Sequence, residues 1–492
     1  MARVIVVGAG PAGLAATEAL LTGSDGPLEV ELHSLEPYLG GNAAAFTTPD
    51  GRVVEQGLHC WFGFYEQMAG LLARSGVDIT QASSSGQGEA LVWEERDQRT
   101  HRLYLGSHTS RTLIQGLAYT GMTLEEKLRF ALFFARAMPE VLAGNAERFD
   151  DICFTAWCIE RGFPPSLAAT RMWRVTREAQ FNLPGQVSAY PMIKTVKVMG
   201  RDFTTADFRF PMGAMSEVWW GPVAARIRAL GGVIHTHHQL TGLSHDGQRI
   251  RSLRLRQVQD APVEDWLQHP VPTVSGSGRE LRDFDQVVFA IPPAAWQEII
   301  HADPSLTELR PFANIAKLST VSPLGLHVWH REAVRWGPRS FVIGLDEPLG
   351  AVVDVKPFHP SYRDDARFGA VLHFVGPETG YEDWPEEALV DRALTSLRRV
   401  RGYEGFTLEG ARAWKLIRHH GPHRRYWNSE PGSLKYKPQS RGPLEGLWFA
   451  GDWVRNELDF PCMESAIRGG RQAAEGVLRE LGQRRRLARR GA

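Results

Sequence analysis

The chain has 492 residues, of which 43% are hydrophobic and 23% charged, and its 56 Lys and Arg residues balance its 56 Asp and Glu residues. This length exceeds what one simple core requires and predicts two domains, while the composition is typical of a globular protein. Because the summed charge is zero, no general attraction to nucleic acid is expected, and no nucleic-acid partner is predicted.

The first predicted elements form a dinucleotide-binding turn. The apolar run from Arg3 to Val7 indicates a buried strand, which leads into Gly8-Ala9-Gly10-Pro11-Ala12-Gly13 and an alanine-rich helix up to Leu21. Gly8 allows the tight turn, Gly10 lets the backbone approach a phosphate, and Gly13 lets helix and strand pack closely. The N-terminus of the helix directs N–H groups at the pyrophosphate, beside Pro11 and Ala12.

The next strand, from Leu28 to Leu32, predicts where the ribose lies. A carboxylate about 20 residues beyond the glycines usually accepts hydrogen bonds from the ribose hydroxyls. Ser34 stands near that position and Glu36 follows two residues later. Either Glu36 reaches the ribose after a shift in the turn, or Ser34 binds it more weakly. A third interpretation makes Glu36 a solvated loop charge.

The first strand begins at residue 3, which predicts that no cleaved signal peptide precedes it and that the protein is cytoplasmic. The four cysteines are widely spaced without a C-x-x-C pair, which argues against disulfides and a cysteine zinc site; they are Cys60, Cys153, Cys158 and Cys462. No stretch reaches the ~18 uncharged apolar residues that span a bilayer.

The region from Leu124 to Leu142 predicts an amphipathic helix. Leu128, Leu132, Phe133 and Ala135 recur at helical spacing, and charged residues interrupt the run. We expect this helix to pack on the core. The alternative is a membrane-facing helix near 124–142, lying on the inner membrane surface with its aromatic side chains down.

Further elements follow in the middle of the chain. Helices are expected over Leu128–Met138, Phe149–Arg161 and Val218–Leu230, strands over Val233–Thr236 and Gln286–Ala290, and loops over Ser83–Leu91 and Gln257–Gly278. His235, His237 and His238 lie along one strand. Because no acidic residue is near them in sequence, no metal site is expected.

The C-terminal region predicts a second helix N-terminus that approaches the same ligand. Residues 446–452 form a short apolar strand ending in Gly451-Asp452, and a helix opens after Phe460-Pro461. The small residues Ala466, Gly469 and Gly470 suit a helix that approaches a ligand closely. Two such helix ends suggest an elongated dinucleotide. The arginine-rich tail from Arg484 to Arg490 is expected to be a solvated end or a contact to anionic lipid.

Three motifs together resemble the flavoprotein amine-oxidase superfamily. Residues 50–65 resemble the E-x-G-L-H-x-F-F-G-x-Y segment of plant-type phytoene desaturase and zeta-carotene desaturase. Phe449-Ala450-Gly451-Asp452-Trp453 and Met463-Glu464-Ser465-Ala466 are similar to the A-G-D-[YW] and M-E-G-A motifs of that branch. Phe210-Pro211-Met212-Gly213 and residues 222–243 match its middle section. The resemblance covers most of the chain except residues 79–125 and 255–280.

The resemblance implies a mixed α/β and α+β fold, with a Rossmann-like FAD-binding domain interleaved with a substrate-binding domain. The FAD-binding domain would comprise residues 1–78, 205–300 and 440–482, and the substrate-binding domain residues 79–204 and 301–439. FAD would be bound non-covalently in an extended form. The implied cofactor contacts are Gly8, Gly10, Pro11, Ala12, Gly13, Glu36, Gly40, Gly41, Asn42, Leu240, Gly451, Asp452, Met463 and Glu464.

Within this set, the Leu240 backbone would lie at the adenine and Asp452 near the ribityl-phosphate region. Main-chain groups of Met463 and Glu464 would lie near the isoalloxazine. The chain departs from the family pattern at Ser34, where Glu is usual, at Asn42, where Arg or Lys is common, and at residues 462–465, which replace S-M-E-G.

The implied activity is that of an FAD-dependent, carotene desaturase-like oxidoreductase that removes hydride from an apolar polyene or isoprenoid substrate. A flavin-dependent amine or amino-acid oxidase and a redox-neutral flavin isomerase are the alternatives. The electron acceptor would be a quinone or oxygen. Phe62, Phe64 and Trp220 are the candidate substrate contacts. His59 is a tentative catalytic residue that either moves a proton or has a structural bond to the main chain.

Overall fold

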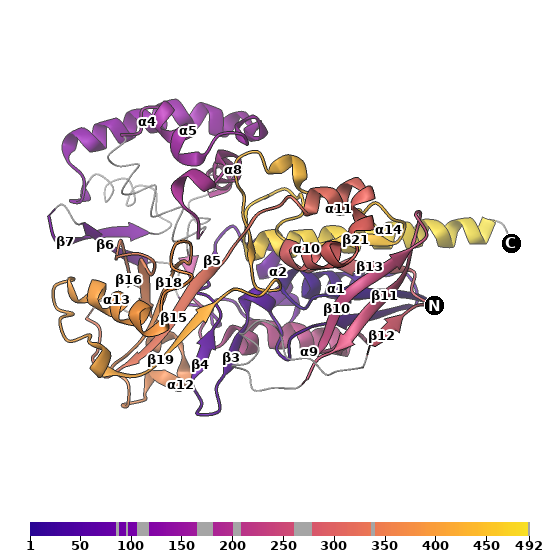
Figure 1. The fold of residues 1–492 in the computed structure, drawn as a ribbon, viewed down its shortest axis with the longest axis horizontal. Coiled ribbons are helices and arrows are strands. Elements are labelled where there is room, and N and C mark those ends of the chain that lie inside the picture. The colour runs from indigo at the N-terminus through magenta and orange to yellow at the C-terminus, as the bar shows by residue number, and fades with distance from the viewer. Residues whose placement is uncertain are drawn as a thin grey trace.

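The computed structural model describes residues 1–84, 88–94, 97–105, 118–164, 181–199, 208–259, 278–335 and 340–490. A five-stranded sheet lies at the end of the molecule that carries both termini, and a seven-stranded sheet lies at the other end (Figure 1). A layer of helices, α4, α5 and α8, sits beside the seven-stranded sheet. The observed mixed α/β architecture confirms the predicted fold class.

The five-stranded sheet is parallel, with the order β21-β13-β1-β2-β9. Its strands are β1 (Ala2–Val7), β2 (Leu28–His33), β9 (Val233–His235), β13 (Gln286–Phe289) and β21 (Leu447–Phe449). The central strand β1 is buried on both faces, as its nearly continuous apolar sequence predicts.

Alternate residues of β1 pack against different layers. Val4 and Val6 contact the core formed with α1 (Pro11–Gly23), α2 (Glu66–Arg74), α9 (Gly221–Ala229) and α14 (Met463–Arg490). Ile5 and Val7 contact the core on the other face. That second layer contains β10 (His238–His245), β11 (Ile250–Gln257), β12 (Gly278–Leu281), α10 (Pro293–Ala302) and α11 (Arg310–Ile315).

The second layer extends past the expected domain boundary at residue 300. Phe312, Ile315 and Leu318 pack into the same core as Ile5 and Val7. The division of the chain into two domains stays a prediction.

The seven-stranded sheet combines distant parts of the chain, in the order β19-β15-β18-β17-β16-β6-β7. Its strands are β6 (Gly88–Glu94), β7 (Arg99–Leu105), β15 (Pro323–His330), β16 (Ser340–Ile343), β17 (Ala351–Asp354), β18 (Ala370–Pro377) and β19 (Ala411–Arg418). β6 pairs with both β7 and β16. The expected loop over Ser83–Leu91 is therefore wrong from Gly88 onward, because long-range pairing extends the strand.

One face of this sheet packs against α13 (Glu386–Arg398). The other face packs against the segment that carries β3 (Ala45–Thr47) and β4 (Val53–Glu55). The remaining short elements are β5 (Trp61–Phe62), β8 (Phe208–Arg209), β14 (Thr320–Val321), β20 (Tyr426–Trp427) and α12 (Pro360–Arg363).

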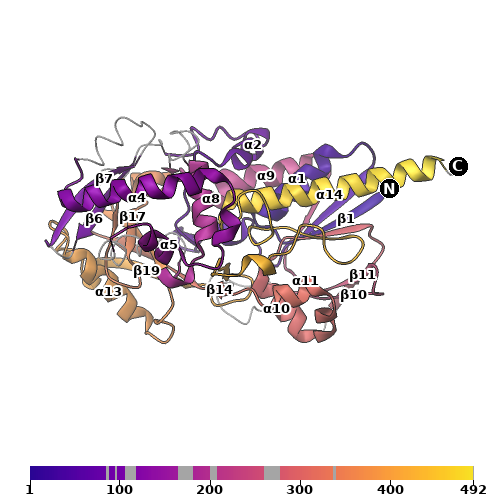
Figure 2. The same ribbon diagram turned by 90° about the horizontal axis from the view of Figure 1, so that it is seen from above.

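The helical layer contains α4 (Leu124–Ala143), α5 (Phe154–Glu160) and α8 (Ala189–Met199), seen from above in Figure 2. A capping box between Thr123 and Glu126 begins α4, and Gly144 at φ +83° ends it. The predicted helix over Phe149–Arg161 is shorter than expected, because a 3₁₀ turn precedes it and Cys153 caps α5.

The predicted helix over Val218–Leu230 begins earlier, as a π-helical turn over Ser216–Trp220 that continues into α9. Most of the expected loop over Gln257–Gly278 and the side chains of Arg484–Arg490 lie outside the described residues. Within the described ranges, every helix is too short or too polar to cross a membrane.

Candidate functional site

One cavity of about 1970 Å³ extends from the glycine turn after β1 to the helical layer. Its walls include residues of β1, the β2 end, α4, α5, β10 and the start of α14. Pockets for a single small molecule usually measure about 300–1,000 Å³. The cavity is therefore large enough for two ligands that meet end to end.

The glycine turn forms the first wall of this cavity. Gly8 has φ +105°, and a Cβ there would lie 2.3 Å from the Ala290 carbonyl oxygen. A Cβ on Gly13 would lie 1.8 Å from the Gly8 oxygen, so only glycine lets α1 pack this closely. Gly10 is the N-cap of α1 and has no side-chain cap. The N–H groups of the first turn are thus open to an anion beside Gly10, Pro11 and Ala12, which line the cavity.

The double glycine extends this wall. Gly40 and Gly41 have φ of +115° and +55°, and the Gly40 N–H donates to the Ala9 oxygen over 2.9 Å. Gly41 and Asn42 line the cavity, whereas Gly40 supports the turn behind them. The buried Asn42 Oδ1 accepts no hydrogen bond from the described residues. A polar ligand at this end would supply the missing donor.

Both candidate ribose residues, Ser34 and Glu36, line the cavity. Glu36 is only 6% exposed, which contradicts its interpretation as a solvated loop charge. Its Oε1 lies 3.0 Å from Arg424 Nη2. Burial raises the pKa of Glu36, while Arg424 opposes that shift. The choice between Ser34 and Glu36 stays open.

The C-terminal motif meets the cavity at Gly451 and Asp452. Gly451 has φ +140°, and a Cβ on Gly469 would lie 2.5 Å from the Gly451 oxygen, so glycines permit this close packing. Burial raises the pKa of Asp452 to about 6, and Lys437 opposes the shift. Asp452 is therefore ionised above this pH and can accept hydrogen bonds from ligand hydroxyls.

Met463 lines the cavity at the start of α14, and Leu240 lines it from β10, while their contacts to FAD stay predictions. The Glu464 side chain points elsewhere. Its two carboxylate oxygens accept the N–H groups of Gln67 and Met68 at the start of α2, over 3.1 and 3.0 Å. Glu464 is fully buried and is not part of the cavity wall, so the main-chain contact that the resemblance implies stays a prediction.

His59 lies on the loop between β4 and β5 and lines the cavity. Its Nδ1–H donates to the Gly57 oxygen over 2.7 Å, which supports the structural interpretation. Burial lowers the pKa of His59 to about 4, so the ring is neutral near pH 7. His419 Nε2 donates to the Gln56 oxygen over 2.7 Å and fixes the same loop.

Two of the three predicted substrate contacts line the cavity, and one does not. Phe62 and Phe64 are stacked with ring centroids 5.5 Å apart. Trp220 is fully buried outside the cavity wall, and its Nε1–H donates to the Ala43 oxygen over 2.6 Å. The prediction for Trp220 is therefore wrong, because its π-helical turn directs the ring behind the double glycine, where it contacts Gly40.

The far end of the cavity has an aromatic wall that sequence reasoning missed. We define this wall by Phe130, Phe133 and Phe134 of α4, Phe154 and Trp157 of α5, and Phe163. Leu103, Phe341 and Ile343 from the seven-stranded sheet also line the cavity. The spacing of Leu128, Leu132, Phe133 and Ala135 predicts the helix, but it does not reveal which surface that helix covers.

The family model described as flavin containing amine oxidoreductase matches residues 11–478. The chain belongs to this family. The match covers nearly the whole chain and confirms the predicted superfamily. The FAD-dependent oxidoreductase chemistry predicted from the sequence is confirmed as well.

Curated relatives support the carotene desaturase-like branch. The 15-cis-phytoene desaturase of Arabidopsis thaliana is 22% identical, covering 97% of this chain and 80% of the relative. The 15-cis-phytoene desaturase of Synechococcus elongatus is 20% identical, with 97% and 96% covered. The zeta-carotene desaturase of Zea mays is 26% identical, with 96% and 82% covered.

Solved structures share the fold. Putrescine oxidase bound to putrescine has a TM-score of 0.68 at 16% identity, with 97% of this chain and 99% of that chain covered. Cyclohexylamine oxidase from Brevibacterium oxydans has a TM-score of 0.63 at 18% identity, with 98% and 99% covered. FAD is the cofactor of this oxidoreductase, and the open α1 N-terminus and the buried Asn42 Oδ1 fit such a group.

Proposed function

We propose that this FAD-dependent oxidoreductase removes hydride from an apolar polyene or isoprenoid substrate. The observation that carries this proposal is the cavity itself, which joins the nucleotide-binding turns to the aromatic wall without a break. Hydrocarbon side chains form most of the far end, where Tyr119, Lys127 and Thr195 are the polar residues among the described lining positions of the helical layer and the seven-stranded sheet. A long hydrocarbon would bury its surface there and gain about 25 cal/mol per Å².

FAD supplies the hydride acceptor, so the protein mainly positions a C–H bond and excludes water. Phe62 and Phe64 both line the cavity, follow His59 closely in the sequence, and stack on each other. We assign them to orienting the reacting segment of the substrate. Loss of hydride from a polyene leaves an allylic cation, and loss of a neighbouring proton completes the new double bond.

His59 is the residue we consider for that proton. Because its Nδ1–H donates to Gly57, its Nε2 carries the free lone pair. An acceptor with a pKa of about 4 is a weak base, whereas general bases work best when their pKa lies near the working pH. An allylic cation is acidic enough to transfer its proton to a weak base or to water. We therefore propose a positioning role for His59.

We further propose that the substrate enters from a lipid surface, with the enzyme in the cytoplasm and peripheral on the inner membrane. Four leucines of α4 support this proposal, since Leu124, Leu128, Leu132 and Leu142 are 74%, 59%, 58% and 64% exposed. The same helix contributes Phe130, Phe133 and Phe134 to the cavity. Glu125 and Arg129 are exposed on the same helix. α4 thus combines exposed leucines and exposed charges with phenylalanines that face the cavity, and an amphipathic helix of this kind suits a lipid surface.

We propose that FAD is bound non-covalently. Cys60 and Cys462 line the cavity, but burial raises the pKa of each thiol to about 12. The thiolate is the reactive form of cysteine, so neither side chain is activated to bond to a flavin. Acid precipitation should release all of the yellow cofactor into the supernatant. Flavin that stays with the precipitated polypeptide would contradict this assignment.

The substrate class is tested by anaerobic mixing of the purified, FAD-loaded protein with carotenes in liposomes and with water-soluble amines. Bleaching of the flavin absorbance reports hydride transfer without requiring the natural electron acceptor. We expect bleaching by a carotene and none by primary amines or amino acids. Bleaching by an amine alone would move the function to amine oxidation, and carotene isomerisation without net bleaching would indicate the redox-neutral alternative.

A further inference from the structure

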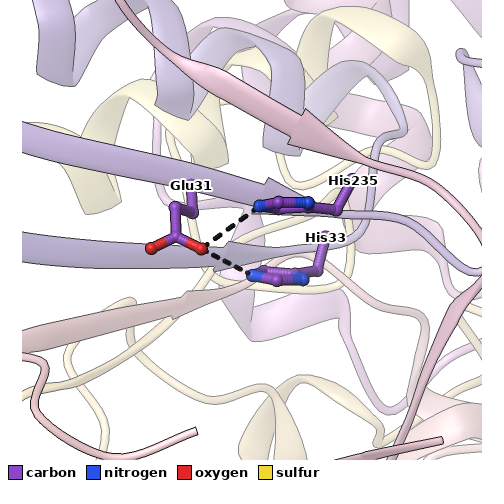
Figure 3. Close-up of side chains that lie close together, drawn as sticks. All are labelled: Glu31, His33 and His235. Atoms are coloured by element: carbon purple, nitrogen blue, oxygen red, sulfur yellow. Dashed lines mark ion pairs between the residues drawn. The ribbon is translucent and has the colours of Figure 1, made fainter. Parts of the chain in front are cut away.

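Three side chains capable of binding a metal converge at the edge of the five-stranded sheet (Figure 3). Glu31 and His33 are two residues apart on β2, so their side chains point to the same face of the sheet. The parallel partner strand β9 places His235 directly beside His33 in the register. Figure 3 shows the two imidazole rings side by side, with one Glu31 oxygen facing both of them.

The distances fit the coordination sphere of a small divalent cation. Glu31 Oε2 lies 3.5 Å from His33 Nε2 and 3.2 Å from His235 Nε2. Zinc bonds of about 2.0–2.2 Å to nitrogen and carboxylate oxygen place neighbouring tetrahedral ligand atoms about 3.3–3.6 Å apart. All three ligand atoms lie within 4.8 Å of one another. The two imidazole rings are stacked, with centroids 4.6 Å apart and 18° between their planes.

A buried nitrogen without a hydrogen bond points into this cluster. His33 is fully buried, and its Nε2 has no hydrogen-bond partner in the described part of the chain. The other ring nitrogen, Nδ1, lies 2.9 Å from His238 Nδ1, so one of these two atoms donates to the other. When His33 Nδ1 donates, the lone pair of Nε2 faces the Glu31 carboxylate, and a cation between them removes that repulsion.

The surroundings resemble the supporting shell of a metal site. Arg3 Nε donates to the other Glu31 oxygen, Oε1, over 2.7 Å, which fixes the orientation of the carboxylate. Histidines that bind metals usually engage their second ring nitrogen in a hydrogen bond, as His33 does with His238. His235 is 31% exposed, so it offers a path of entry and room for a water as fourth ligand.

We propose that Glu31, His33 and His235 form a binding site for a divalent transition-metal ion, best matched by Zn²⁺. Two imidazoles and one carboxylate with an open fourth position are a ligand set that suits zinc. His33 and His238 also line the cavity next to Ser34. A bound ion would thus tie β2 to β9 directly behind the nucleotide end of the cavity, without contacting the reacting part of the substrate.

This site differs from the expectation drawn from His235, His237 and His238. No acidic residue stood near those histidines in sequence, so no metal site was expected. The acidic ligand, Glu31, comes from β2, about 200 residues earlier in the chain. The second histidine of the cluster is His33, and neither His237 nor His238 belongs to it. His238 instead contacts the second nitrogen of His33.

The test uses the full-length FAD-loaded protein without a polyhistidine tag, stripped with a chelator and titrated with Zn²⁺ by calorimetry. We expect one ion per chain and a rise in melting temperature with Zn²⁺. Substitutions of outer partners typically cost 10–100-fold in metal affinity, so removing a ligand by His235→Asn should weaken binding at least about tenfold. His301→Asn, at an exposed histidine of α10, is the matched control and should bind normally.

Glu31→Gln provides a second variant, which keeps the side-chain shape but removes the charge. Flavin content and circular dichroism identify any variant that fails to fold, and His235→Asn alone then decides, because His235 is the most exposed ligand. Equal Zn²⁺ affinity in the wild type, His235→Asn and His301→Asn would overturn the proposal. Absence of saturable binding in the folded wild type would overturn it as well.

Discussion

The nucleotide end of the cavity is bounded mainly by main-chain groups, whereas its far end is bounded by side chains. At the nucleotide end, Gly8, Gly10 and Gly451 expose their backbone to the cavity. A Cβ at Gly8 or Gly13 would collide with a carbonyl oxygen. At the other end, phenylalanines from α4 and residues of the seven-stranded sheet line the cavity. Recognition by the backbone requires particular residues, while an apolar wall requires only bulk and hydrophobicity.

This difference predicts how each end tolerates substitution. A single added side chain should abolish cofactor binding at the backbone end. At the aromatic end, the loss of one ring leaves neighbouring rings in place, so the effects should be graded. The following substitutions test that contrast, beginning with the largest expected effect.

Gly10→Val should yield folded protein without FAD. Gly10 has φ −73°, which valine adopts, and the nearest atoms to its Cβ position are 4.0 Å away. The new side chain therefore fits the protein but occupies the space beside the first turn of α1. The ratio of flavin to protein absorbance and circular dichroism report the two properties. Gly13→Ala is the contrasting variant, because its Cβ would lie 1.8 Å from the Gly8 oxygen and disrupt folding. Yellow Gly10→Val protein would remove this residue from the site.

The double variant Leu128→Asp/Leu132→Asp should lose activity on substrate in liposomes. Both side chains are more than half exposed on α4, and burial of a leucine in lipid contributes up to about 1.5–3 kcal/mol. We expect liposome binding and flavin bleaching by liposomal carotene to fall at least about tenfold. Reduction by dithionite should be unchanged. Leu230→Asp, at an exposed leucine that follows α9, is the control, and an equal loss in that variant would contradict a specific role for α4.

Asp452→Ala should weaken FAD binding by about 0.5–1.5 kcal/mol, which corresponds to about 2–13-fold, because a hydrogen-bond acceptor is lost. The pKa of Asp452, raised to about 6, determines how FAD affinity should change with pH. The ionised carboxylate is the stronger acceptor, so wild-type affinity should decrease as the pH falls through 6, and the variant should lack this decrease. Titration of the apoprotein with FAD between pH 5 and 8 measures both. Identical affinities throughout would remove Asp452 from the cofactor site.

His59→Phe should lower the rate of flavin reduction by less than about tenfold if His59 only positions its loop. Its pKa of about 4 keeps the wild-type ring neutral between pH 5 and 8. Wild type and variant should therefore show the same pH profile over that range in stopped-flow bleaching. A fall of about 10²–10⁴-fold in the variant is what lost acid–base catalysis causes, and it would assign proton transfer to His59.

Trp220→Phe should have the smallest effect and should act on stability alone. The variant loses the hydrogen bond from Trp220 Nε1 to the Ala43 oxygen, which lowers the free energy of unfolding by about 1 kcal/mol. Thermal unfolding measures this change. Because Trp220 lies outside the cavity wall, the relative rates with different carotenes should stay the same. A changed substrate preference would return this residue to the substrate site.

Some elements and residues were predictable from the sequence and others were not. Glycine turns and buried strands depend on residues that are neighbours in the sequence. The strand at Arg3–Val7, the helix after Gly10 and the turn at Gly451 were therefore all predicted near their observed positions. Trp220 was misassigned, because a π-helical turn rotates its ring away from the cavity. The aromatic character of Trp220 indicates a candidate contact but does not show which way its ring points.

The sequence by itself determined the family, the cofactor and the dinucleotide-binding turn, because each of the motifs that indicate them consists of residues close together in the chain. Only the tertiary structure decided which surfaces meet. It brought β6 beside β16, directed the phenylalanines of α4 into the cavity, and placed Glu31 beside His235. Such contacts arise from strand pairing and packing over more than 200 residues, and the hydrophobicity of each segment alone leaves the partner undefined.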